Sequence, residues 1–329
     1  MLRKQNGHDE DRPFSFVKRK RRVETTCEKC APTRKAASDV PHWQIRPYVS
    51  KGYRGALTPL QCVTSLFYLH NETGNIWTHI FGACLALKLT LTVSSGGGEA
   101  LSDMVVSSGS GTDFTDQLVL RVFLGAGVCA FILSTVYHVG NCASSEERCS
   151  TLLWLDLNGI ALLISGSFFP GIYFGFACFP LLRDLYLTIA ATVLVAVFLA
   201  ANCVKLQHYR VRMMVTGVLV GVGIALHWLL VVSEEAKTHL MTKLLMMLGL
   251  YAAGFGFYAT HFPECLLPGS FDLILHSHQL WHGCVVAAFY LWYLDCLACQ
   301  ELFKERGCDA FISQVVADQS LRASRGLAH

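Results

Sequence analysis

Charged residues are scarce in this chain of 329 residues. Asp, Glu, Lys and Arg make up 16% of the sequence and apolar residues 53%, whereas a soluble globular domain carries about 25% charged residues. This deficit excludes a disordered chain, a nucleic-acid-binding protein with a basic surface, and most ordinary cytosolic enzymes. A mean hydropathy of +0.41 indicates a membrane protein instead.

The sequence also shows no cleavable signal peptide and no second CxxC motif. The first residues, MLRKQNGHDEDRPF, hold no apolar core of a cleavable signal peptide, so we expect the first span to act as the insertion signal. Cys27 and Cys30 form a CxxC motif without a second one, which favours a structural or incidental role over a zinc or redox site. The 14 cysteines follow no secreted framework, and those in apolar runs, such as Cys178, are expected to pack as small hydrophobic side chains.

The charge is unevenly distributed. Residues 1–56 carry a net charge of +8 and the remainder carries −5. We therefore predict a basic, mostly disordered cytosolic tail over residues 1–55, a membrane domain over 56–298 and a C-terminal tail over 299–329. The KRKRR run at 18–22 is expected to contact anionic lipid or solvent, with a nuclear signal or a partner site as alternatives.

Seven segments are long and apolar enough to span a bilayer, which takes about 20 residues. The predicted spans are 76–95, 118–140, 152–176, 185–204, 213–233, 240–261 and 276–297. The fold class is therefore an all-α, seven-transmembrane helix bundle. A stretch before the first span, RPYVSKGYRGALTPLQCVTSLFYLH, mixes aromatic and basic residues and is expected to lie along the cytosolic interface.

The orientation follows from basic residues in the loops. The N-terminal tail is basic, the loop after the first span has four acids and no Lys or Arg, and KLQHYRVR follows the fourth span. A cytosolic N-terminus and a lumenal or extracellular C-terminus place all of these basic signals on the inner side.

Polar and ionisable residues within spans are costly and are functional candidates. Four groups lie at span ends that this orientation brings to the cytosolic side. They are Glu72, Asn75 and His79 at the start of the first span, Ser134 and His138 at the end of the second, Asp156 at the start of the third, and His278 and His282 at the start of the seventh.

The histidines predict a metal site. His278 and His282 are separated by four residues and share one helical face, and His138 can supply a third ligand. Three His ligands and an open position are typical of catalytic zinc, whereas Mg²⁺ or Ca²⁺ would require more carboxylates. Isolated histidines of this kind would instead be packing residues, which is the interpretation we give to His227, while His276 is assigned to a helix start.

The remaining polar residues suggest chemistry around the metal. Asp156 can act as a general base toward a zinc-bound water, and Ser134 can donate to a substrate carbonyl as negative charge develops. Glu72, Asn75 and His79 are assigned to groups behind the ligands, to a cap, or to a hydrogen-bond clamp between spans.

Several motifs resemble the progestin and adipoQ receptor family. PYVSKGYR, SLFYLHNETGNIWTH, STVYH, LDLNGIALLISGSF, FPECLLPGSFD and HSHQLWH run in family order over residues 47–297. Within the family they are most similar to the branch described as a Golgi-resident Raf kinase trap. The chain departs from the family after the sixth span, where Cys265 follows Pro263 and Glu264 in place of an arginine that would form a loop ion pair.

The resemblance implies zinc near the inner leaflet, bound by the residues matching His138, His278 and His282, with Asp156 near the bound water and Ser134 beside it. The adiponectin receptors of this family are linked to hydrolysis of the ceramide amide, which suggests a ceramide-like substrate. A Golgi membrane is favoured, with the plasma membrane as the alternative.

Three functions stay open at this point. The first is a zinc-dependent hydrolase of a lipid amide. The second is a non-catalytic scaffold whose basic tail tethers a cytosolic kinase such as Raf, with structural zinc. The third is a receptor for a steroid or a secreted protein, which the short or Gly/Ser-rich outer loops support least.

Overall fold

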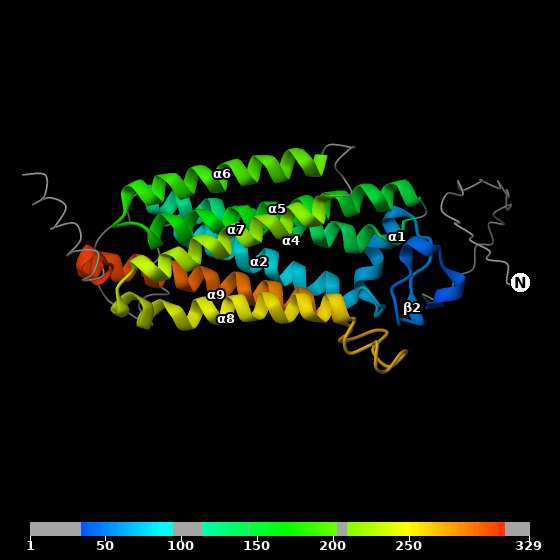
Figure 1. Ribbon diagram of the computed structural model, residues 1–329. Coiled ribbons are helices and arrows are strands. Elements are labelled where there is room, and N and C mark those ends of the chain that lie inside the picture. The colour runs from blue at the N-terminus through cyan, green and yellow to red at the C-terminus, as the bar shows by residue number, and fades with distance from the viewer. Residues whose placement is uncertain (1–33, 95–113, 144, 203–208, 313–329) are drawn as a thin grey trace, which may run out of the picture. The chain divides into compact units, whose positions relative to one another are not determined.

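A computed structural model of the chain describes residues 34–94, 114–143, 145–202 and 209–312, all within one compact unit. Among these residues, seven helices are long and apolar enough to cross a membrane, which confirms the helical fold class (Figure 1). They are α2 (Thr73–Ser94), α4 (Phe114–Gly140), α5 (Glu146–Gly175), α6 (Pro180–Asn202), α7 (Arg210–Val231), α8 (Glu234–Thr260) and α9 (Ser277–Arg306). The direction in which they cross stays a prediction.

The helices match the predicted spans except at the edges, most clearly at the end of α9. This helix continues past the predicted edge at 297 to Arg306 and stops before Gly307. Its buried positions include Tyr293, Cys296, Cys299 and Leu302, a spacing of three residues that keeps one face against the bundle. The face of α9 that packs against the bundle thus continues beyond the apolar stretch from which the span was predicted.

Helix α9 is central to the bundle because it packs against α8, α2 and α5. Phe289 of α9 meets Phe123 and Phe131 of α4 in a buried aromatic cluster. Helix α6 instead lies at the outside of the bundle (Figure 1) and is only 11% buried. Its exposed apolar side chains, such as Leu181 and Leu199, are those of a lipid-facing helix.

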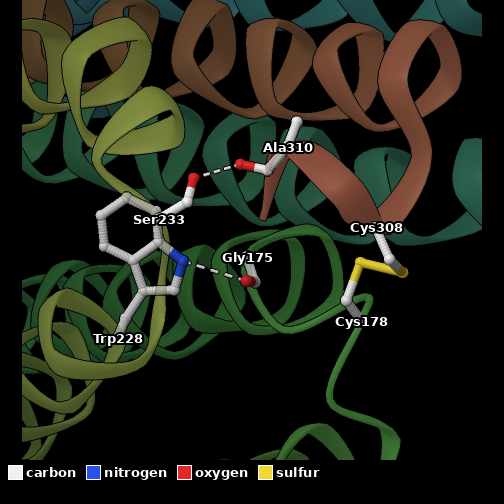
Figure 2. The surroundings of a disulfide bond; sticks show 6 residues. All are labelled: Gly175, Cys178, Trp228, Ser233, Cys308 and Ala310. Carbon is white, nitrogen blue, oxygen red and sulfur yellow. Dashed lines mark hydrogen bonds between the residues drawn. A yellow bond between two sulfur atoms is a disulfide. The ribbon is translucent and has the colours of Figure 1, made fainter. Parts of the chain in front are cut away.

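One expectation about the cysteines is wrong. Cys178, which we assigned to apolar packing, forms a disulfide with Cys308 across 130 residues (Figure 2). Nearby, Trp228 donates to the carbonyl of Gly175 at 2.9 Å and Ser233 donates to the carbonyl of Ala310. The loop after α5 and the segment after α9 are therefore joined, a pairing that follows from helix packing and not from cysteine spacing.

Residues 34–67, which cover the described part of the predicted tail, fold onto one end of the bundle. They form β1 (Lys35–Ala36), η1 (Ala37–Asp39), η2 (His42–Gln44), β2 (Lys51–Tyr53), α1 (Pro59–Thr64) and η3 (Ser65–Phe67), with β1 antiparallel to β2. Asp272 accepts from the backbone N–H groups of Ser50 and Lys51 at 3.0 Å each. These contacts tie residues 50 and 51 to the segment that connects α8 and α9.

Helix α1 begins at a capping box, in which Thr58 and Gln61 exchange hydrogen bonds and Pro59 occupies the first turn. Leu60 and Phe67 are 75% and 83% exposed, as expected of the predicted interfacial stretch. The CxxC pair, the KRKRR run, most of the loop after the first span, residues 203–208 and the end of the C-terminal tail lie outside the described residues. The three-part domain division stays a prediction.

Candidate metal centre

Three histidines from two helices converge at the end of the bundle where α4 ends and α9 begins. His138 comes from α4, and His278 and His282 come from successive turns of α9. One ring nitrogen of each lies within 4.8 Å of the others. The ring of His138 lies 5.2 Å from that of His278 and 4.7 Å from that of His282, centroid to centroid. The predicted ligand set is therefore brought together by the contact of α4 with α9.

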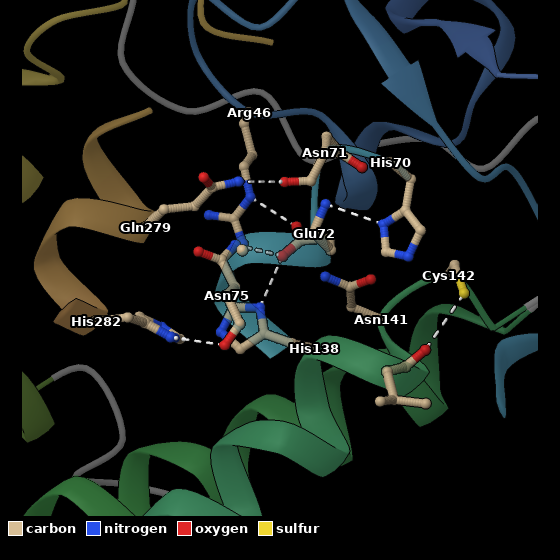
Figure 3. A network of polar contacts seen from close by, with 12 residues as sticks. Arg46, His70, Asn71, Glu72, Asn75, His138, Asn141, Cys142, Gln279 and His282 are labelled. Atoms are coloured by element: carbon tan, nitrogen blue, oxygen red, sulfur yellow. Dashed lines mark hydrogen bonds and ion pairs between the residues drawn. The ribbon is translucent and has the colours of Figure 1, made fainter. Parts of the chain in front are cut away.

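Hydrogen bonds orient two of these rings. His138 Nδ1 lies 2.8 Å from the Glu72 carboxylate (Figure 3), and His282 Nδ1 lies 3.1 Å from the carbonyl oxygen of Asn75. Both partners can only accept, so Nδ1 carries the proton in each ring. The Nε2 atom of each ring is thereby left as the ligand atom, as in carboxylate–histidine–metal arrangements.

One buried histidine nitrogen of the site is available to bind a metal. His138 is fully buried, and its Nε2 has no hydrogen-bond partner within the described residues. A buried polar atom without a partner is costly. Imidazole nitrogen is a preferred ligand of zinc and other transition metals, whereas Mg²⁺ and Ca²⁺ prefer oxygen. The three imidazoles therefore fit zinc.

Glu72 is held in its charged form by one cation, an imidazole N–H and an amide. Arg46 Nε donates to Oε1 at 2.7 Å, and Asn75 Nδ2 donates to Oε2 at 2.6 Å. Burial by itself raises the pKa of Glu72, but the charge of Arg46 and the contacts with His138 outweigh it and hold the pKa well below its ordinary value. Glu72 is thus a carboxylate that accepts the His138 proton.

His79 occupies a different place from Glu72 and Asn75, although the sequence groups all three. Its ring stacks on His282 with centroids 3.7 Å apart, and it meets the edge of Phe131 at 5.1 Å. Both of its ring nitrogens are buried without a hydrogen-bond partner in the part of the chain that the structure describes. His79 therefore packs behind the ligand His282 and is not part of the Glu72 network.

Asp156 and Ser134 lie next to each other at the same end of the bundle. Ser134 is one turn before His138 on α4, Asp156 is on α5, and both are buried. The Ser134 side chain lies close enough to interact with the Asp156 carboxylate, which also interacts electrostatically with His138. All the site residues predicted from the sequence thus come from four helices to one end of the bundle.

Two arginines near the site were missed by the sequence analysis. Arg46 binds Glu72, and the buried Arg54 donates to the carbonyl oxygens of His138 at 2.6 Å and Val139 at 3.0 Å. The Arg54 guanidinium also donates to Asn141 and Ser65, and it neutralises the carbonyl end of α4. The only signal was the position of both arginines in an aromatic, basic stretch.

Glu264 precedes Cys265, the residue that stands where we expected an arginine, and it forms hydrogen bonds with the start of α9 instead of a loop ion pair. Glu264 is buried and accepts from the backbone N–H of Ser277 at 2.7 Å and from the Ser277 hydroxyl. Glu264 therefore caps the start of α9, directly before the ligand His278. His276 is the N-cap residue of α9, with Nε2 2.8 Å from the Asn71 carbonyl, which agrees with its assignment to a helix start.

The fold and the site define a heptahelical membrane protein with a buried histidine triad at one end. Residues 67–293 match the family described as haemolysin-III related. The chain belongs to this family, which includes the progestin and adipoQ receptors.

Individual relatives support the assignment. The chain is 28% identical to human progestin and adipoQ receptor family member 3 over 82% of this chain and 86% of that protein. It is 32% identical to the Drosophila melanogaster adiponectin receptor protein over 78% of this chain and 57% of that protein. It is 30% identical to a heptahelical transmembrane protein of Oryza sativa subsp. japonica over 78% of this chain and 81% of that protein. The protein is therefore a multi-pass, adiponectin-receptor-like membrane protein.

Proposed function

We propose that this protein binds one zinc ion through His138, His278 and His282 and hydrolyses the amide of a ceramide-like lipid. The observation that carries the proposal is the pairing of two features at one end of the bundle. One is a histidine triad whose His138 Nε2 is buried and has no hydrogen-bond partner among the described residues. The other is a buried Asp156–Ser134 pair beside it.

The residues have separate tasks in this reaction. Zinc, when bound, supplies a Lewis acid and lowers the pKa of a coordinated water. Asp156 takes the proton of the attacking water and then delivers it to the amine that leaves. Ser134 turns from Asp156 to donate to the carbonyl oxygen as negative charge develops there. Glu72 and Asn75 hold His138 and His282 in place through their Nδ1 atoms.

Metal analysis tests the first half of the proposal. Full-length protein purified in detergent without chelator is expected to carry about one zinc per chain, by the single three-histidine site. The variant His282→Ala should lose it, whereas His239→Ala, an exposed histidine of α8, should keep it. The absence of zinc from the unmodified protein would overturn the proposal.

Turnover of a ceramide-like amide tests the second half. Asp156→Asn should retain zinc but lose activity, because an amide cannot accept the proton of the attacking water. Unchanged turnover in this variant would contradict the role of Asp156 as base. Retained zinc with no turnover in the unmodified protein would leave the triad as a structural site.

The proposal includes an orientation, with the N-terminus in the cytosol and the C-terminus in a lumen or outside the cell. The disulfide supports it, since Cys178 and Cys308 follow the ends of α5 and α9, whereas the triad lies at the start of α9, and disulfides persist in oxidising compartments. A Golgi membrane is the proposed location, with the plasma membrane as the alternative. Imaging with compartment markers and protease protection of each terminus tests both statements.

A second candidate is a non-catalytic scaffold that tethers a Raf-type kinase. The similarity to family member 3 over most of both chains favours it, given the kinase-trapping role associated with that branch. Deleting residues 1–33 should abolish kinase recruitment and leave the zinc content unchanged. The deletion stops before Arg46 because Arg46 contacts Glu72 behind the metal ligands. Recruitment that survives the deletion would exclude residues 1–33 as the binding element.

A further inference from the structure

Two cysteine thiols lie in contact at the same end of the bundle as the triad but outside it. Cys62 is on α1 and Cys142 lies just beyond the end of α4, 80 residues away in sequence, and their sulfur atoms are 3.2 Å apart. Both residues are buried. The backbone holds the two segments in register, because Leu57 N–H donates to the Cys142 carbonyl at 2.9 Å. A disulfide requires sulfurs at about 2.05 Å, so a shift of about 1 Å would suffice.

The surroundings divide the pair into a nucleophile and a proton donor. The hydrogen bond from Cys142 and the charge of Arg54 lower the pKa of Cys62 to about 7 despite burial. The same hydrogen bond and burial raise the pKa of Cys142. The opposite directions of the two pKa changes make Cys62 the sulfur that ionises more readily to the thiolate, the reactive form of cysteine, whereas Cys142 keeps its proton. Arg54 is itself fixed by its hydrogen bonds to the last turn of α4.

We propose that Cys62 and Cys142 form a redox-reactive dithiol that hydrogen peroxide closes to a disulfide and a thiol reductant reopens. The Cys62 thiolate attacks one peroxide oxygen, the O–O bond breaks, and hydroxide leaves with a proton from solvent as water. Cys62 is then a sulfenic acid. The Cys142 sulfur attacks the Cys62 sulfur, and the proton of Cys142 leaves with the sulfenic hydroxyl as a second water. Two thiols and one peroxide thus give one disulfide and two waters.

The cross-link has a defined structural effect. It joins α1 covalently to the turn after α4, whose preceding turn carries His138. Cys142 Sγ also lies 3.4 Å from the Val139 carbonyl oxygen (Figure 3), which accepts the single S–H of Cys142 when that S–H does not point to Cys62, and Arg54 binds the same oxygen. Oxidation therefore fixes α1 against the end of α4 and slows the local unfolding of α1. Burial of both thiols selects a small oxidant over a bulky one.

Peptide mapping of full-length protein in detergent tests the proposal. The protein is treated with hydrogen peroxide, denatured with an alkylating reagent, digested and analysed by mass spectrometry. We expect most chains to acquire a peptide that links Cys62 to Cys142 and to lose it after reduced glutathione is added. The variant Cys62→Ser should leave Cys142 alkylated, whereas Cys149→Ser, which removes another buried thiol near this end, should leave the link unchanged.

Hydrogen exchange gives a second readout. Amides of residues 57–64 should exchange more slowly in the oxidised protein than in the reduced one, and Cys62→Ser should show no such difference. This comparison uses the unmodified protein in both states, so it stands even if a variant fails to fold.

Four outcomes would overturn the proposal. After peroxide treatment, both thiols could still react fully with the alkylating reagent. Alternatively, Cys62 could be oxidised to a sulfinic acid, or Cys142 could form a disulfide with a different cysteine. The fourth is a Cys62–Cys142 link already complete in protein alkylated directly in living cells, which would make it a structural disulfide. None of these results depends on zinc or on lipid hydrolysis.

Discussion

Glu72 and His138 lie 66 residues apart in the sequence, yet the carboxylate of one meets Nδ1 of the other at 2.8 Å inside the protein. The contact connects the residue directly before α2 to the last turns of α4. It determines which nitrogen of His138 faces the metal site, because Glu72 can only accept. A carboxylate directly before one helix thus orients a proposed metal ligand on another.

Replacing Glu72 with Gln should weaken zinc binding. The neutral amide is a poorer acceptor for His138 Nδ1–H and no longer pairs with Arg46. Loss of such an outer contact lowers metal affinity by about 10- to 100-fold. Competition with a fluorescent chelator measures the change. Glu235→Gln, which removes a partner of Arg306 at the other end of the bundle, should leave the affinity as it is, and equal affinities for all three proteins would contradict the role of Glu72.

Replacing Arg54 should destabilise the protein. Its side chain is buried and donates to two carbonyl oxygens, a hydroxyl and an amide oxygen. Truncation to Ala leaves these acceptors unpaired, at about 1–3 kcal/mol for each buried group that water cannot reach. Lys should rescue little, because an ammonium lacks the planar fork of donors. Thermal unfolding in detergent measures the loss, with the more exposed Arg183→Ala as the control; a Lys variant as stable as the wild type would argue against the fork.

Replacing Gly74 with Ala should disturb the contact between α2 and α9. An added Cβ would overlap the side chain of Gln279, which donates to the carbonyls of Asn71 and Leu273 and accepts from Leu275. Overpacking of this kind costs about 1–3 kcal/mol. Gly283→Ala on α9 is the matched control, because its added Cβ meets nothing within 4 Å. Melting temperatures of the two variants should therefore differ in the order Gly283→Ala above Gly74→Ala, and the reverse order would be inconsistent with close packing at Gly74.

His70 should make stability fall in mild acid. Burial, followed by the charge of Arg54, lowers the pKa of His70 from 6.5 to about 3. Above pH 6.5 the residue is neutral in both states. Between pH 6.5 and 3 only the unfolded chain binds a proton at this residue, so stability is lost as the pH falls, by at most about 1.4 kcal/mol per pH unit.

The measurement compares thermal unfolding at pH 7 and pH 5. His70→Asn keeps an acceptor for the Glu72 N–H, which His70 Nδ1 accepts at 3.1 Å, but does not titrate. Its melting temperature should fall less between the two pH values than that of the wild type. His42→Asn, whose side chain is exposed, should behave like the wild type. An unchanged pH dependence in His70→Asn would contradict a buried, neutral His70.

The seven spans and the polar residues at their ends could be predicted from the amino-acid sequence alone. Span length is a local property, because each helix must satisfy its own backbone in the bilayer, and a costly polar group in an apolar run is visible without a structure. The spacing of His278 and His282 places both on one helical face for the same local reason. His138, Asp156 and Ser134 could be added because span ends share a membrane depth.

Which side chains contact each other could be established only from the packed helices. Arg46 with Glu72, Cys178 with Cys308, and Cys62 with Cys142 are pairs from segments far apart in the chain. His79, grouped with Glu72 by the sequence, stacks on His282 instead. These contacts depend on which helices are neighbours and how each is rotated about its axis. Hydropathy reports that a helix is buried in the bilayer, but the packing of its faces against other helices sets its neighbours and its rotation.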